Sequence, residues 1–173
     1  GAAFYVLDAE RGTARALLPD RTPFAADAQR GGPLVMDFAA CRGPNWRTDA
    51  FARDFTINAI AVSLEDGALI DETNGLADLS AGVIRATNDR AMDDDPVRAL
   101  RAVRLAFGLN MRIEPATLAM VRSTGPALSR PSAERLRDEL MAILKLDEAA
   151  RAAHMLDDLG LLVPLVPEIE PMR

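Results

Sequence analysis

Residues 93–104, with the sequence DDDPVRALRAVR, begin the most regular helical pattern in the chain. Their apolar side chains recur every three or four residues, which on a helix of 3.6 residues per turn places the following on one face: Val97, Leu100, Val103 and Phe107. Arg98 and Arg101 fall on the opposite side. Pro96 fits the first turn, because its fixed backbone angle suits a helix start. The pattern predicts an amphipathic helix over Asp93–Gly108.

Toward the C-terminus, three further helical patterns follow, at Pro115–Thr124, Ser132–Leu146 and Asp147–Leu159. Proline and serine are common where helices begin, which supports the starts of the first two. We find no strand pattern beyond about Asn88. The second half of the chain, residues 89–173, is therefore predicted to be an all-helical domain.

Toward the N-terminus the pattern changes to short strands. We predict strands at Phe4–Leu7 and Thr13–Leu18, joined by a tight turn in which Gly12 takes a positive φ, and a third strand at Leu34–Phe38. The polar, turn-rich stretch Pro19–Pro33 is predicted to be a surface loop.

A helix over Thr48–Val62 and a hairpin of Ala61–Leu64 with Ala68–Asp71 complete this half. Residues 1–88 are thus predicted to form a mixed domain with an antiparallel or mixed sheet. The predicted fold class of the whole chain is α+β.

The composition excludes several classes of protein. Of the 173 residues, 49% are hydrophobic and 27% charged, as in a folded soluble domain. No apolar run approaches the roughly 20 residues that cross a membrane, so no membrane partner is expected. A single cysteine, Cys41, excludes an internal disulfide and a cysteine-rich zinc site and favours the cytoplasm.

The charge is unevenly distributed. A net charge of −6 argues against a protein that coats nucleic acid, and DNA in particular, by bulk electrostatics. Residues 85–130, however, carry 8 basic and 5 acidic side chains, a net charge of +3. Arginine, the main basic residue here, suits phosphates and base edges.

Asp95 and Arg98 are three residues apart and hence neighbours on a helix. A carboxylate only accepts hydrogen bonds and a guanidinium only donates them. Cytosine and adenine place an amino donor beside a ring-nitrogen acceptor, whereas uracil and guanine place a carbonyl beside an N–H. The pair could therefore select cytosine and adenine. The alternative is an ordinary acidic cluster at a helix N-terminus with solvated ion pairs.

A second polar group precedes the predicted hairpin. Asp54 and Asn58 are one helical turn apart, with Arg53 beside them. These side chains suit a ribose hydroxyl and a phosphate. The alternative is a surface helix whose polar side chains pair locally.

Four blocks of sequence resemble the class II tRNA nucleotidyltransferases (CCA-adding enzymes) and bacterial poly(A) polymerases in order and spacing. They are RDFTINA at 53–59, the segment 71–79, DDPVRALRAVR at 94–104, and SAER at 132–135 with Glu139 and Leu140. The resemblance implies a partial nucleotidyltransferase head domain over residues 1–88, followed by an all-helical neck that binds nucleotide and RNA.

The resemblance also implies roles for individual residues. Asp95 and Arg98 would form the amino-acid template that selects CTP and ATP. Three arginines would hold the incoming nucleotide, with Asp54 near the sugar: Arg53, Arg101 and Arg104. The reaction would be attack of an RNA 3′-hydroxyl on the α-phosphate with two Mg²⁺ ions. Glu134 and Arg135 would support the template helix.

The chain also departs from the family pattern. The Gly-rich segment and Asp-x-Asp pair that hold the metal ions are absent and are expected upstream of Gly1, so we expect these residues alone to be inactive. Asp37 lies where a third metal-binding, catalytic carboxylate would stand, although a structural aspartate at a strand end is the alternative. Ala52 replaces a second arginine, and Asp94 a commoner glutamate.

The predicted function is addition of C and A nucleotides, from CTP and ATP, to the 3′ end of tRNA or another RNA. Poly(A) synthesis would use the same choice of amino-bearing bases. A non-catalytic RNA-binding module that has lost the metal site is the alternative from a different class.

Overall fold

The computed structural model describes residues 3–10, 12–18 and 34–172, which form two compact units, Gly1–Trp46 and Arg47–Arg173. Each unit is described by itself. In the described ranges, no helix is both long and apolar enough to cross a membrane.

The first unit contains a three-stranded antiparallel sheet in the order β1-β2-β3. The strands are β1 (Ala3–Asp8), β2 (Thr13–Leu18) and β3 (Leu34–Ala39), which confirms the three predicted strands. Gly12 has a φ of 59°, as the predicted tight turn requires. The predicted loop Pro19–Pro33 lies outside the described residues.

The second unit begins at Arg47, the second residue of α1 (Trp46–Ala52), and this helix is shorter than the one predicted over Thr48–Val62. That prediction was wrong beyond Ala52. Phe55 is extended and fully buried, and it forms an isolated antiparallel bridge with Ala86. Burial of this aromatic side chain and pairing with a distant segment outweigh the helical periodicity of the sequence.

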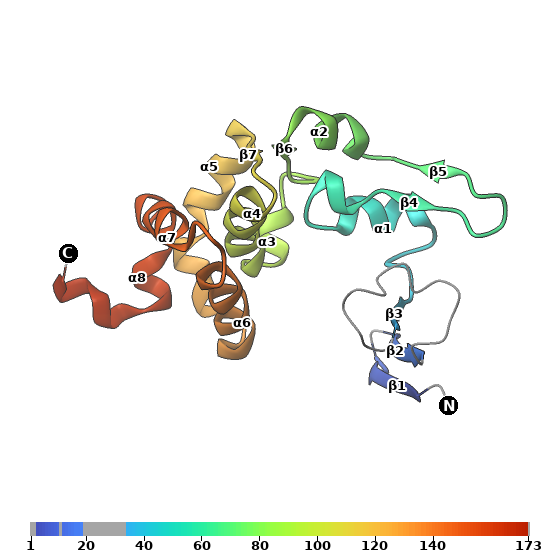
Figure 1. Cartoon of the computed structure of the whole chain (residues 1–173), viewed down its shortest axis with the longest axis horizontal. Coiled ribbons are helices and arrows are strands. Elements are labelled where there is room, and N and C mark those ends of the chain that lie inside the picture. The colour runs from blue at the N-terminus through green and yellow to red at the C-terminus, as the bar shows by residue number, and fades with distance from the viewer. Residues whose placement is uncertain (1–2, 11, 19–33, 173) are drawn as a thin grey trace. The chain divides into compact units, whose positions relative to one another are not determined.

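A short 3-10 helix, η1 (Thr56–Asn58), and a hairpin follow. The strands β4 (Ala61–Val62) and β5 (Leu69–Ile70) pair antiparallel and confirm the predicted hairpin (Figure 1). The next helix, α2 (Gly75–Ala81), begins where the carboxylate of Asp71 accepts the N–H groups of Gly75 and Leu76 at 2.7 and 2.9 Å.

The predicted helix Asp93–Gly108 is two helices, α3 (Ala91–Asp94) and α4 (Val97–Gly108). Asp95, between them, has φ −151° and ψ 98° because the ring of Pro96 disfavours a helical conformation in the residue before it. The break places Asp95 at the start of α4.

The expectation that strands end near Asn88 was also wrong. A short strand, β7 (Arg112–Ile113), pairs parallel with β6 (Val83–Ile84). The N–H of Ala86 donates to Oγ1 of Thr117 at 2.9 Å. Segments on either side of the predicted domain boundary at residues 88 and 89 are therefore hydrogen-bonded to each other.

The remaining helices agree with the predicted pattern to within two residues at either end: α5 (Pro115–Ser123), α6 (Ala133–Leu144) and α7 (Ala149–Asp158). Three short elements were not predicted: η2 (Gly125–Ser129), α8 (Leu162–Leu165) and η3 (Pro167–Met172).

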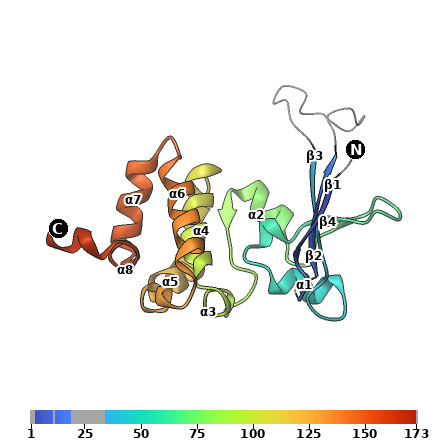
Figure 2. The same cartoon turned by 90° about the horizontal axis from the view of Figure 1, so that it is seen from below.

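The core of the second unit lies where α4 packs against α6 and α7 (Figure 2). Its large, fully buried side chains include Leu100, Val103, Val121, Leu128, Ile143 and Leu156. Burial of each leucine in this set stabilises the fold by about 1.5–3 kcal/mol. The core fixes the position of α4, whose arginine side chains belong to the candidate site.

Candidate nucleotide-binding site

Arg98 lies in the first turn of α4 and is only 6% exposed. Its guanidinium donates to the carbonyl oxygens of Ala52 at 2.8 Å and of Arg53 and Ala91, each at 3.2 Å. The first two carbonyls lie at the C-terminal end of α1, where a helix leaves acceptors without intrahelical partners. Arg98 therefore holds the end of α1 against α4.

Asp95 lies beside Arg98, but the two side chains have different partners. One carboxylate oxygen of Asp95 accepts the N–H of Val97 at 3.3 Å, and the other accepts Nη2 of Arg135 at 2.6 Å. Arg135 belongs to the first turn of α6. This contact fits the interpretation that Arg135 supports the start of α4.

Asp54 and Asn58 come together as the sequence predicted, although a turn and η1 rather than one continuous helix connect them. The Asp54 carboxylate is largely buried and accepts Nδ2 of Asn58 at 3.0 Å, the N–H of Phe55 at 2.8 Å and Nη1 of Arg101 at 2.8 Å. Burial alone would raise the pKa of Asp54, but the three hydrogen bonds together outweigh it and lower the pKa.

Contacts with Asp49 and Asn58 help to hold Arg53 beside this group. Its Nε donates to the buried carboxylate of Asp49 at 2.9 Å, and Nη1 donates to the carbonyl oxygen of Asn58 at 3.3 Å. The side chain of Arg53 remains 40% exposed. It can therefore meet a ligand without leaving Asp49.

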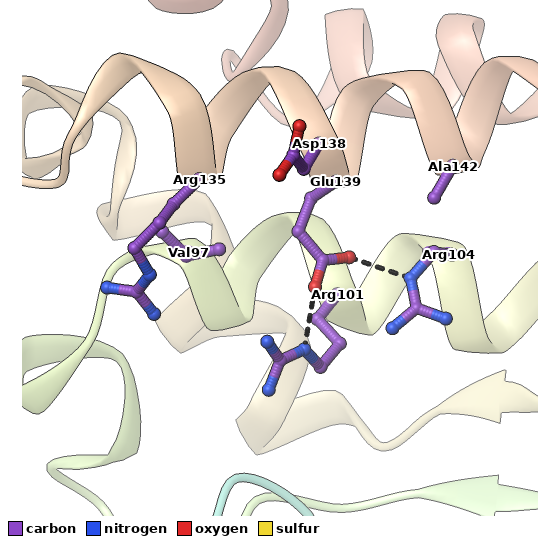
Figure 3. A pocket seen from close by; sticks show the side chains of 7 residues that line it. All are labelled: Val97, Arg101, Arg104, Arg135, Asp138, Glu139 and Ala142. Carbon is purple, nitrogen blue, oxygen red and sulfur yellow. Dashed lines mark hydrogen bonds and ion pairs between the residues drawn. The ribbon is translucent and has the colours of Figure 1, made fainter. Parts of the chain in front are cut away.

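A groove of about 280 Å³ runs between α4 and α6. Its lining residues are labelled in Figure 3: Val97, Arg101, Arg104, Arg135, Asp138, Glu139 and Ala142. Glu139 lies between two arginines and accepts Nε of Arg101 at 2.8 Å and Nε of Arg104 at 2.7 Å. Three guanidinium groups along one groove suit a ligand that carries several phosphates.

Asp37, the predicted metal ligand, lies in the first unit and pairs with Arg15 on the neighbouring strand. The two carboxylate oxygens accept Nε and Nη2 of Arg15 at 2.6 and 2.9 Å, and this contact lowers the pKa of Asp37. No group of three or more potential metal ligands occurs within the described ranges. These residues alone therefore do not fit a Mg²⁺ site.

Sequence reasoning gave no ligand-positioning role to Glu139 and did not connect Asp49 with Arg53. The available signal for Glu139 was its place in the fourth family block, which contains three charged residues on α6. Its partners on α4 are 35 and 38 residues away, a separation that helical periodicity does not address.

The ion pair of Asp54 and Arg101 predicts that the stability of the fold depends on pH. The pKa of Asp54 is lower in the folded than in the unfolded chain, so the unfolded state takes up its proton first as the pH falls below about 4. The stability that the ionised Asp54 carboxylate contributes above that pH should therefore be lost as the pH falls toward its pKa in the folded chain. In urea unfolding, the free energy of unfolding should decrease less between pH 6 and pH 3 for Asp54→Asn than for the wild type. Equal slopes would contradict this assignment.

Comparison with known proteins agrees with this fold. Residues 17–85 match the family model described as the poly A polymerase head domain. Residues 110–173 match the one described as the probable RNA and SrmB-binding site of polymerase A. Together the two models include most of both units.

Individual relatives are similar along nearly the whole chain. The CC-adding tRNA nucleotidyltransferase of Geobacter sulfurreducens is 41% identical over 149 residues, which are 86% of this chain and 32% of that protein. The A-adding tRNA nucleotidyltransferase of Deinococcus radiodurans is 37% identical over 167 residues, 90% of this chain and 38% of that protein. The chain thus spans about a third of the length of these relatives.

A solved structure supports the same conclusion. The complex of a CCA-adding enzyme with CTP has a TM-score of 0.81 and 30% identity, covering 97% of this chain and 40% of that one. The fold is that of a partial nucleotidyltransferase head joined to a helical neck. The chain belongs to the family of tRNA nucleotidyltransferases and bacterial poly(A) polymerases.

Proposed function

We propose that the protein to which these residues belong adds cytidine or adenosine nucleotides, from CTP or ATP, to the 3′ end of tRNA in the cytoplasm. The observation that carries the proposal is the arrangement around the first turns of α4. There, Arg98 lies one turn before Arg101, and Asp95 pairs with Arg135, which lines the same groove as Arg101 and Arg104. The names of the relatives and the CTP complex of a similar enzyme support it.

In this proposal the base meets Asp95 and Arg98. An Asp95 oxygen accepts the amino group of cytosine or adenine, and the Arg98 guanidinium donates to the neighbouring ring nitrogen. Uracil and guanine present the opposite polarity to both groups. The contacts of Arg98 with α1 and of Asp95 with Arg135 restrain both side chains in the absence of a base, which supports a preorganised template.

The rest of the nucleotide is assigned to the neighbouring residues. Asp54 lies near the sugar, and three arginines contact the phosphates: Arg53, Arg101 and Arg104. Arginine presents a fork of N–H donors to phosphate oxygens, which fixes their orientation as well as their charge. A ligand carrying a triphosphate suits this set better than a neutral one.

The proposed reaction joins the RNA 3′-hydroxyl to the α-phosphate and releases pyrophosphate. Mg²⁺, when bound at the family's metal site, would stabilise the attacking and leaving oxygens. The described residues do not fit that site, so the role proposed for this part of the protein is to select and orient the nucleotide. Asp37 as a metal ligand remains a prediction.

The test is nucleotide addition by the full-length protein to a tRNA that lacks its terminal CCA, with each of the four triphosphates. We expect addition from CTP, ATP or both, and little from GTP or UTP. Asp95→Ala should reduce the preference by about 5- to 160-fold, as expected for loss of one good base contact.

Asp94→Ala is the matched control, because Asp94 is adjacent but pairs with the exposed Arg90. It should keep the preference of the wild type. Equal losses with all four triphosphates in Asp95→Ala would contradict the template role of Asp95. Absence of any nucleotide addition by the wild type would favour a non-catalytic RNA-binding module.

Poly(A) polymerase activity is the second candidate, because both family models that match the chain are named for that enzyme. It would use the same contacts to adenine. The two activities differ in the RNA and in product length: a short CC, A or CCA end on tRNA, or a long adenosine tail on other RNA. Analysis of product length with ATP alone distinguishes them.

A further inference from the structure

Glu139 connects the two arginines assigned to the phosphates. Each of its carboxylate oxygens accepts one Nε–H, from Arg101 at 2.8 Å and from Arg104 at 2.7 Å. The side chain of Glu139 is 12% exposed, whereas each of the two arginine side chains is about 30% exposed. The carboxylate therefore lies on the protein side of the two guanidinium groups.

Bonding through Nε determines which nitrogens remain available. Arg101 uses Nη1 for Asp54, and its Nη2 has no protein partner within the described part of the chain. Neither terminal nitrogen of Arg104 has a partner there. Figure 3 shows the terminal nitrogens of both groups on the side away from Glu139. The carboxylate thus orients the N–H donors toward a ligand.

The charges show that Glu139 does not increase attraction for an anion. Asp54 and Glu139 together balance Arg101 and Arg104, so the glutamate lowers the local positive charge. A site selected only for phosphate affinity would gain from its removal. Any contribution of Glu139 to the placement of an anionic ligand therefore comes from the geometry that it imposes on the two guanidinium groups.

We propose that Glu139 is a positioning residue that fixes the directions of Arg101 and Arg104 toward the triphosphate of the incoming nucleotide. This inference rests on the proposed function and deepens it. Glu139 touches neither the base nor the reacting atoms in this assignment. It acts through the two arginines, so its loss should affect the productive orientation of the nucleotide more than its binding.

The test is Glu139→Gln in the full-length protein, with kcat and KM measured for CTP and ATP. Glutamine keeps the shape and one acceptor oxygen, but its amide sets an N–H against the second arginine. We expect kcat to fall by about 10- to 100-fold, as for a small misplacement of an orienting group. KM should stay unchanged or fall, because a negative charge near the phosphates is lost.

Glu148→Gln is the matched control, because it makes the same chemical change at a residue that does not line the groove. Glu148 precedes α7, its side chain is 49% exposed and it pairs with Arg151. It should keep the kcat and KM of the wild type. If Glu139→Gln behaves like this control, or raises KM without lowering kcat, the positioning role is wrong.

A double-mutant cycle separates positioning from a general effect on folding. In an Arg104→Gln background, Glu139→Gln should lower kcat less than it does in the wild type, because one of its two targets is already lost. Fully additive losses would overturn the inference. If the wild type adds no nucleotide, both the proposed function and this inference are overturned. If the wild type is active but the losses in kcat are fully additive, this inference alone is overturned.

Discussion

Replacing Arg98 with methionine is expected to lower the free energy of unfolding of this chain by about 3–5 kcal/mol. Methionine can fill the volume of the aliphatic stem but supplies no donor. The carbonyl oxygens of Ala52, Arg53 and Ala91 would then lose a charged partner. Each such hydrogen bond is worth about 1.5–3 kcal/mol, and partial access of water recovers part of the loss.

Urea unfolding followed by circular dichroism measures this change. Arg90→Met is the matched control, because Arg90 directly precedes α3, its side chain is 75% exposed and it pairs with Asp94. It should change the unfolding free energy by less than about 0.5 kcal/mol. Similar values for the two variants would show that Arg98 does not hold the end of α1.

The expected loss affects the design of base-selection experiments. A variant at Arg98 alters both a candidate base contact and the packing of α1 on α4. Arg98→Lys keeps the charge, but one ammonium group cannot reproduce the planar fork that reaches several carbonyls. Asp95, whose side chain is 22% exposed, is therefore the better position at which to test base choice.

Gly75→Ala is expected to lower the free energy of unfolding by about 3 kcal/mol, at the upper end of the range for an overpacked site. An added Cβ would collide with the carbonyl oxygen of Thr56 and come within 2.8 Å of Cγ1 of Ile60. A backbone oxygen cannot rotate away as a flexible side chain can. The start of α2 would have to move from η1, which disturbs the hydrogen bond from Oγ1 of Thr56 to Asp78.

Because η1 also carries Asn58, the effect should reach the candidate site. Gly108→Ala is the control, since its added Cβ would make ordinary contact with Leu146 at 3.5 Å. Thermal unfolding should show a large decrease in Tm for Gly75→Ala and a small change for the control. Equal Tm values would contradict the close packing of α2 on η1.

The sequence predicts best where structure is local and periodic. The arginine helix and the three long helices after it were predicted because each buries one apolar face at helical spacing. Phe55 was misplaced because its partner, Ala86, is 31 residues away and the pairing leaves no local pattern. The strand of Arg112 and Ile113 is too short to produce an alternating pattern.

The same division applies to the candidate site. Asp95 and Arg98 are neighbours in sequence, so their placement on one turn was predictable. Their partners were not, because Arg135 and the carbonyls of α1 come from other elements. The contact of Asp54 with Arg101 spans 47 residues, and only the folded chain joins the proposed sugar and phosphate contacts into one group.

The parallel pairing of β6 with β7 has a consequence for protein engineering. Exchange of the helical segment between relatives is an obvious way to transfer base preference, and residue 88 looks like a natural junction. A chimera joined there would take β6 from one parent and β7 from the other, with the Ala86–Thr117 hydrogen bond crossing the same junction. A junction beside Arg47, where the second compact unit starts, keeps these partners from one parent.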